Sequence, residues 1–115
     1  MKLATTTGDY SLYTDSQAVA LEHLRAAGFR YADYNFGIDY NHRNGVYSEH
    51  FNRYLAEISQ TCDRLGIRLV QAHAPMGSPL EDTDGSFLSD TLRCVDACGA
   101  NEAKTLSGRF SHLVF

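Results

Sequence analysis

The stretch IRLVQAHAP, residues 67–75, begins as an apolar strand and ends in a histidine and a proline. Proline has no backbone N–H, so it cannot continue a ladder of strand hydrogen bonds. The predicted strand Arg68–His73 therefore carries an imidazole at its last position. In folds built from parallel strands, the loops and side chains at the carboxyl ends of the strands form the functional face. His73 is thus the first candidate for a functional residue.

One layout of helix end, glycine, apolar residue, basic residue and strand recurs along the chain. It appears as RAAGFRYADYNF from Arg25, as DRLGIRLVQAHA from Asp63, and as the start of DACGANEAKTL from Asp96. Gly28, Gly66 and Gly99 fit the left-handed position that ends a helix. These glycines lie 38 and 33 residues apart. Such spacing suits one helix, one strand and their loops in each repeat.

Apolar residues between the glycines recur at helical spacing. We predict helices over residues 16–27 and 86–98 and, between them, a helix whose apolar stripe runs from Phe51 to Leu65. Thr14, Asp15 and Ser16 can each cap the first helix, and Ser48 can cap the second. The predicted strands cover residues 2–6, 31–35 and 68–73. The apolar face of the third helix is expected to contain Leu88, Leu92, Val95 and Cys98. Strands that alternate with helices in this way predict an α/β fold with a parallel sheet.

The predicted strand-to-helix loops, residues 7–15, 36–49 and 74–85, are longer than the glycine turns on the other side. Alternate residues of a strand share one face of a sheet. This alternation groups Leu69 with Gln71 and His73, and Asp33 with Asn35. We expect His73 and Asp33 to point to the same side of the sheet. Both the mouth of a barrel and the crevice of an open doubly wound sheet would fit this pattern.

Composition narrows the possible partners. The chain has 115 residues, enough for at most one domain. Its net charge is −4 and it has no basic stripe, so the composition does not support nucleic-acid binding. No apolar run has membrane-spanning length, and the first residues lack the apolar stretch of a signal peptide. Three cysteines, an odd number without a secretory signal, favour free thiols. We therefore expect a cytoplasmic protein.

Three segments carry a family resemblance: QAHAP at the end of the third strand, DACGA in the next helix, and AAGFRYADYNF. They resemble the sugar phosphate isomerase/epimerase group, which are xylose isomerase-like (β/α)8 TIM barrels related to the type IV apurinic endonucleases. The resemblance covers residues 1–105 and only the N-terminal part of such a barrel. It implies about three βα units and the start of a fourth.

The resemblance also implies a chemistry. Such enzymes hold a divalent metal ion (Mn, Mg, Zn or Co) at the mouth of the barrel and isomerise or epimerise a small sugar or polyol by proton transfer next to a carbonyl. By this likeness His73 is a metal ligand and Asp33 is an acidic residue near the mouth. We expect Asp33, Asn35 and Gln71 to contact the substrate. The catalytic residues and further ligands belong to later strands, so this fragment is expected to be inactive alone.

Two other interpretations stay open. The chain could be a small α/β binding or interaction module without catalysis, because a complete barrel needs about 250 residues. A DNA repair activity like that of the apurinic endonucleases is disfavoured by the acidic balance. The final residues, SGRFSHLVF, fit a fourth strand poorly, so we expect the barrel pattern to break off after about residue 106. The open edge of a partial sheet would then favour self-association.

Overall fold

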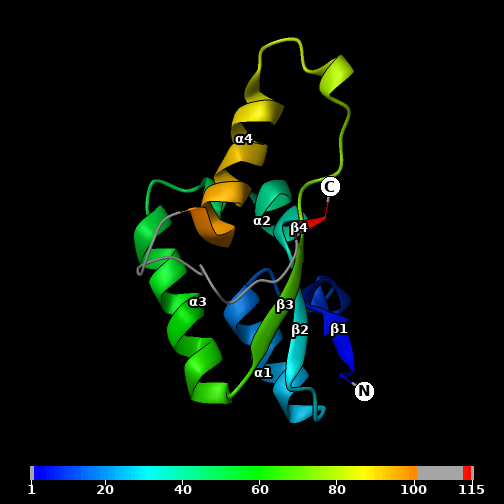
Figure 1. Ribbon diagram of the computed structural model, residues 1–115, viewed down its shortest axis with the longest axis vertical. Coiled ribbons are helices and arrows are strands. Elements are labelled where there is room, and N and C mark those ends of the chain that lie inside the picture. Colours follow the sequence, from blue (N-terminus) through cyan, green and yellow to red (C-terminus); the bar gives the residue numbers. More distant parts are fainter. Residues whose placement is uncertain (1, 101–112, 115) are drawn as a thin grey trace.

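The computed structural model describes residues 2–100 and 113–114 (Figure 1). Its strands are β1 (Ala4–Thr6), β2 (Tyr31–Asn35), β3 (Arg68–His73) and β4 (Leu113–Val114), and its helices are α1 (Gln17–Ala26), α2 (Phe36–His42), α3 (Phe51–Leu65) and α4 (Ser86–Val95). Short helical turns cover Thr7–Tyr10 (η1), Gly45–Tyr47 (η2), Pro79–Glu81 (η3) and Asp96–Ala100 (η4). The described strands form one parallel sheet in the order β1-β2-β3-β4. The predicted α/β class is confirmed.

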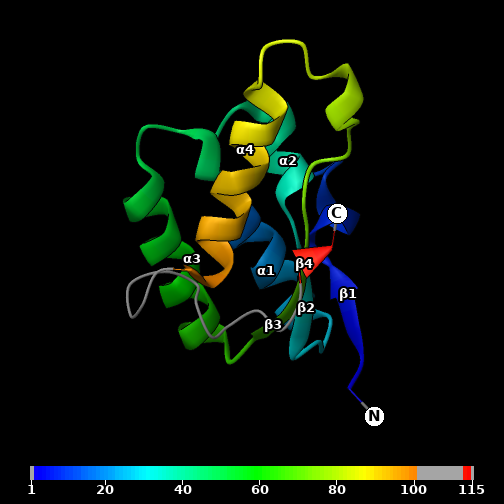
Figure 2. The same ribbon diagram turned by 45° about the horizontal axis from the view of Figure 1, so that its top comes forward.

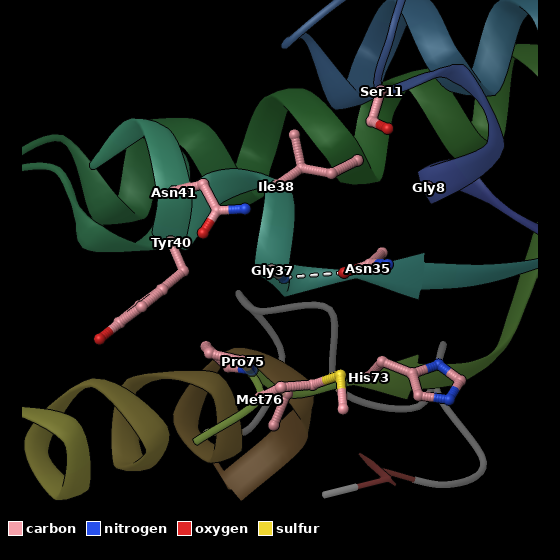
Figure 3. Close-up of a pocket in the computed structure, with 11 residues that line it drawn as sticks. Gly8, Ser11, Asn35, Gly37, Ile38, Tyr40, Asn41, His73, Pro75 and Met76 are labelled. Carbon is pink, nitrogen blue, oxygen red and sulfur yellow. Dashed lines mark hydrogen bonds between the residues drawn. The ribbon is translucent and has the colours of Figure 1, made fainter.

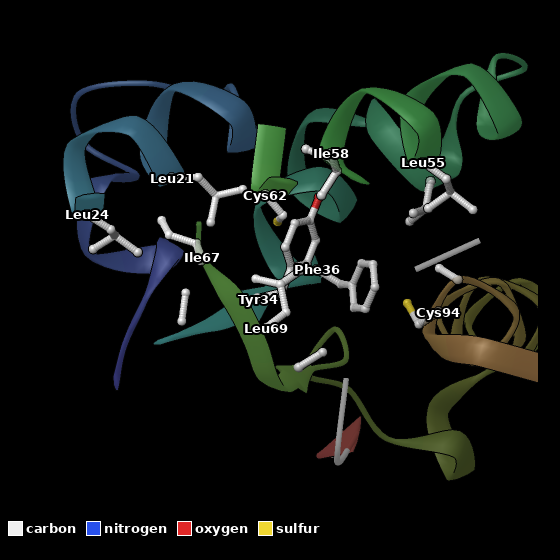
Figure 4. Packing of buried hydrophobic residues seen from close by; sticks show 14 of the residues in the cluster. Leu21, Leu24, Tyr34, Phe36, Leu55, Ile58, Cys62, Ile67, Leu69 and Cys94 are labelled. Carbon is white, nitrogen blue, oxygen red and sulfur yellow. The ribbon is translucent and has the colours of Figure 1, made fainter. Parts of the chain in front are cut away.

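The helices lie on one side of the sheet, with α1 packed against α3 (Figures 1 and 2). Between them and the sheet is an apolar core, which Figure 4 shows. Its largest fully buried apolar side chains are Leu21 and Leu24 of α1, Leu55 and Ile58 of α3, and Tyr34, Phe36 and Leu69. Burying each aliphatic side chain of this size stabilises the fold by about 1.5–3 kcal/mol. The repeated βα units thus bury a single continuous core.

Strand β3 contains a bulge that changes which side chains share a face. Ala32 pairs with Leu69, but the next residue, Asp33, pairs with Gln71, so Val70 is an extra residue in β3. Leu69 and Ala72 are therefore both fully buried on the helix side. The expected grouping of Leu69 with Gln71 and His73 was wrong. Strict alternation fails here because a bulge shifts the phase of every residue after it.

The loop predicted over residues 36–49 contains α2 and the turn η2. Helix α2 begins at the end of β2, where the side-chain oxygen of Asn35 accepts a hydrogen bond from Gly37 N at 2.8 Å. The predicted cap of the following helix was also wrong. His50 is the N-cap of α3, and Ser48 Oγ accepts a hydrogen bond from His50 N at 3.2 Å in the turn before it.

Helix α4 buries a different face from the predicted one. Leu88 and Leu92 are 56% and 54% exposed, whereas Cys94 is fully buried. Polar contacts fix this rotation of α4: Asp90 pairs with Arg43 at 2.7 Å, and Arg93 Nε donates to Val46 O at 2.7 Å. The predicted apolar stripe was wrong because these bonds to η2 and the end of α2 orient the helix.

The helix ends that were predicted from Gly28 and Gly66 are confirmed. Gly28 and Gly66 both have a positive φ, at 98° and 66°. The expected break of the barrel pattern after about residue 106 falls within residues 101–112, outside the described part of the chain. Leu113 and Val114 pair in parallel with Ala72 and His73. Among the described helices, none combines the length and apolar character needed to cross a bilayer.

Ser16, one of the three candidates that the sequence offered, is the N-cap of α1, and its Oγ accepts a hydrogen bond from Val19 N at 3.3 Å. We expect Ser16→Ala to lower the free energy of unfolding by about 1 kcal/mol, because the helix loses the acceptor of one free N–H group. Urea-induced unfolding followed by circular dichroism measures this loss. Ser89→Ala, at an exposed position inside α4, is the control and should cause no loss. Equal effects of the two changes would contradict the capping role.

Candidate functional site

His73 ends β3, and its imidazole contacts the carboxylate of Asp33 on the neighbouring strand. His73 Nδ1 lies 2.6 Å from Asp33 Oδ2. The side chain of His73 is 43% exposed and that of Asp33 is 14% exposed, so the imidazole can be reached from solvent while the carboxylate is mostly buried. The prediction that the two residues point to the same side is confirmed. The contact exists because the bulge at Val70 places the residues after it on the open face.

The Asp33 carboxylate controls which imidazole nitrogen can bind a ligand. With Nδ1 donating to Asp33, a neutral imidazole leaves the lone pair of Nε2 free. Metal-binding histidines commonly use this arrangement, in which a carboxylate holds the far nitrogen. Gln71 Nε2 also lies 3.5 Å from Asp33 Oδ2, while Oδ1 is buried and has no hydrogen-bond partner among the described residues. Asp33 thus orients the imidazole of His73, and Gln71 holds the carboxylate of Asp33.

Asn35 occupies a different position from the other three candidates. It pairs with His73 in the sheet, but its side chain caps α2 through Gly37 N. The side chain of Asn35 packs closely against both Gly8 and Gly37. A Cβ added at Gly8 would lie 2.7 Å from Asn35 Nδ2, and a Cβ added at Gly37 would lie 2.8 Å from Asn35 Oδ1. Asn35 therefore joins β2 to α2 beside the histidine.

A cavity of about 450 Å³ opens at the carboxyl ends of β2 and β3. Its lining residues come from four segments: Gly8 and Ser11; Asn35 and Gly37; Ile38, Tyr40 and Asn41; and His73, Ala74, Pro75 and Met76 (Figure 3). The volume is within the range of small-molecule sites. Of the predicted site residues, Asn35 and His73 line the cavity, whereas Asp33 contacts His73 and Gln71 contacts Asp33.

Sequence analysis missed the wall formed by α2. Tyr40 and Asn41 supply a phenol and an amide to this cavity, and both fall in the segment predicted to be a loop. One signal was available: Asn35 lies at the end of a predicted strand, and asparagine there is a common helix N-cap. An apolar pair, Phe36 and Ile38, then follows on the buried side. Apolar residues two positions apart do not share a helix face, so Phe36 and Ile38 added no helical signal to that of Asn35.

The residues present fit a metal ion only in part. His73 Nε2 suits a borderline divalent ion, and Asp33 provides the usual support behind it. Within residues 2–100 and 113–114, no group of three or more His, Cys, Asp or Glu side chains is placed to hold a metal. In the described part of the chain, His73 is therefore a candidate ligand without the further ligands that a metal site needs.

Comparisons with known proteins gave no match: no family model, no curated protein and no solved structure is significantly similar to this chain.

Proposed function

We propose that this chain is the N-terminal part of a (β/α)8 barrel that isomerises or epimerises a small sugar or polyol with the help of a divalent metal ion. One observation carries the proposal: the Asp33–His73 pair lies at the carboxyl end of the parallel sheet and at the wall of a ligand-sized cavity. In βα folds, ligands bind at this end of the strands. The motif QAHAP, which carries the family resemblance, places His73 there.

Each residue has a separate role in this proposal. His73 binds the metal through Nε2, and Asp33 orients the imidazole by accepting a hydrogen bond from its Nδ1. Asn35 and Asn41 offer amide groups, and Tyr40 a phenol, that suit the hydroxyl groups of a polyol. A bound divalent ion would stabilise the negative charge that develops on a carbonyl oxygen when a neighbouring proton is removed. Gln71 contributes by holding Asp33.

Manganese titration tests the metal role of His73. We expect Mn²⁺ to broaden the NMR signals of His73 and of the nearby cavity residues Asn35 and Met76 in the full chain. His73→Gln should abolish this broadening. Asp33→Asn should weaken Mn²⁺ binding about tenfold or more, because the orienting charge behind the imidazole is lost.

His50→Gln is the matched control, because His50 is also an exposed histidine but lies at the start of α3. It should leave the broadening at His73 unchanged. If Mn²⁺ broadens His50 as strongly as His73, the proposed metal site is refuted. If a polyol such as xylitol shifts the signals of Asn35 and Asn41 without any metal requirement, the binding-module alternative replaces the enzyme.

A further inference from the structure

Asp39 is a buried carboxylate held by three other elements of the fold. It lies in α2 and is 1% exposed. Tyr54 OH of α3 donates to its two oxygens at 3.2 and 3.0 Å, Gln17 Nε2 of α1 lies 3.4 Å from Oδ1, and Tyr34 OH of β2 lies 3.4 Å from Oδ2. Asp39 therefore attaches α2 to the rest of the molecule.

Among the described residues, the groups that surround Asp39 offer no positive charge to its carboxylate. Facing it are the neutral Gln17, Tyr34 and Tyr54, with Tyr47 and Cys94 in electrostatic range, and the acidic Asp15 and Glu57 line the adjoining cavity. The guanidinium of Arg43, at the end of α2, is engaged with Asp90 of α4 instead. Burial raises the pKa of Asp39 to about 7, against hydrogen bonds from Tyr54, Gln17 and Tyr34 that act to lower the pKa. Its charge state therefore changes near neutral pH.

A second cavity gives water a place beside this carboxylate. It has a volume of about 220 Å³ and is lined by polar side chains that include Asp15, Gln17, Asp39, Asn44, Tyr54 and Glu57. Ionised carboxylates are strongly stabilised by water. An ionised Asp39 would therefore gain hydration if its carboxylate turned toward this cavity.

A short chain of contacts connects Asp39 to the cavity beside His73. The Gln17 amide that contacts Asp39 also donates to Asn35 O at 2.6 Å. Asn35 in turn caps α2 through Gly37 N. The two groups near Gln17 Nε2, Asn35 O and Asp39 Oδ1, accept hydrogen bonds. This position must therefore hold the nitrogen of the Gln17 amide and not its oxygen. Helix α2 therefore has Asp39 on one side and cavity-lining residues, such as Ile38 and Asn41, on the other (Figure 3).

We propose that Asp39 is a proton-sensitive anchor, which couples its ionisation to the position of α2 and so to the shape of the cavity beside His73. When Asp39 is protonated, α2 remains close to α1, β2 and α3. When Asp39 ionises, its carboxylate draws water from the second cavity and α2 shifts. This inference concerns the wall of the cavity and does not depend on the chemistry proposed above.

NMR titration of the full chain, without substrate or metal, tests the anchor. The carboxyl carbon of Asp39 should titrate near pH 7, and the amide signals of Gly37, Tyr40 and Asn41 should change with the same midpoint. In Asp39→Asn these amide changes should disappear. Asp84→Asn is the control, because Asp84 is an exposed carboxylate in the loop before α4 and should leave the changes intact.

A second variant keeps the test valid if Asp39→Asn does not fold. Tyr54→Phe removes a donor that stabilises the ionised carboxylate, so it should move the midpoints of Asp39 and of the α2 amides upward together. His42→Gln removes the imidazole at the end of α2 and should leave both midpoints in place. Amide signals of α2 that do not change between pH 5.5 and 8.5, or that change alike in Asp39→Asn, would overturn the proposal.

Discussion

Gly45→Ala is expected to lower the free energy of unfolding by about 2–5 kcal/mol. Gly45 has a φ of +58°, where an L-residue costs about 1–2 kcal/mol. A Cβ at this position would lie 2.7 Å from the carboxyl carbon of Asp39 and 2.8 Å from the ring of Tyr54. Such overpacking of a closely fitted region costs a further 1–3 kcal/mol or so. Urea-induced unfolding, followed by circular dichroism, measures the change.

Gly66→Ala separates the two contributions. Gly66 has nearly the same backbone conformation, with a φ of +66°, but an added Cβ would meet no atom within 4 Å. We therefore expect only the backbone cost, about 1–2 kcal/mol, in Gly66→Ala. The packing of Gly45 against Asp39 and Tyr54 is refuted if the two variants lose the same stability.

Much of the fold could be predicted because local signals mark the ends of its elements. Gly66 ends α3, and the following apolar run forms β3, whose bounds match the prediction. The stripe of α3 was also informative, since Leu55, Ile58 and Cys62 recur at helical spacing and are all buried. Where glycine and hydrophobic periodicity agree, sequence alone indicates both the type and the limits of an element.

The errors arise where contacts distant in sequence decide the structure. The bulge at Val70 depends on how β3 pairs with β2, and no local pattern in QAHAP reveals it. The rotation of α4 depends on the pairing of Asp90 with Arg43, which is 47 residues away. Propensity and periodicity describe neighbours in sequence, so a long-range ion pair can override an apolar stripe such as Leu88 and Leu92.

The sequence predicted where the candidate site lies but did not predict all of its contacts. His73 and Asp33 share a face as expected, but Asp33 contacts the imidazole and does not line the cavity. Asp39 was not considered, although FGIDY places an acid between apolar residues. An acidic residue so placed is either a solvent-facing helix position or a buried group. Only the tertiary contacts with Tyr34 and Tyr54 distinguish the two.

The stability of the protein should fall by about 3 kcal/mol between pH 5 and pH 8 because of Asp39 alone. In the unfolded chain this carboxyl ionises near its usual pKa of 3.8, but in the folded protein burial raises the pKa to about 7. Between these two values the folded state binds one more proton than the unfolded state. Its stabilisation is therefore complete below the lower pKa and decreases as the pH rises through the upper one. Urea-induced unfolding at several pH values measures this slope.

Asp39→Asn should remove this part of the pH dependence, because the amide replaces the neutral acid in shape and cannot ionise. At pH 8 the variant is expected to be more stable than the wild type by about 1–3 kcal/mol, since it no longer buries a charge. The two proteins differ in this one side chain, and burial raises the pKa of Cys94 and Cys98 to about 12, above this window. The difference between the two slopes thus belongs to Asp39. If wild type and variant lose stability in parallel from pH 5 to pH 8, Asp39 is already ionised in the folded protein and the raised pKa is wrong.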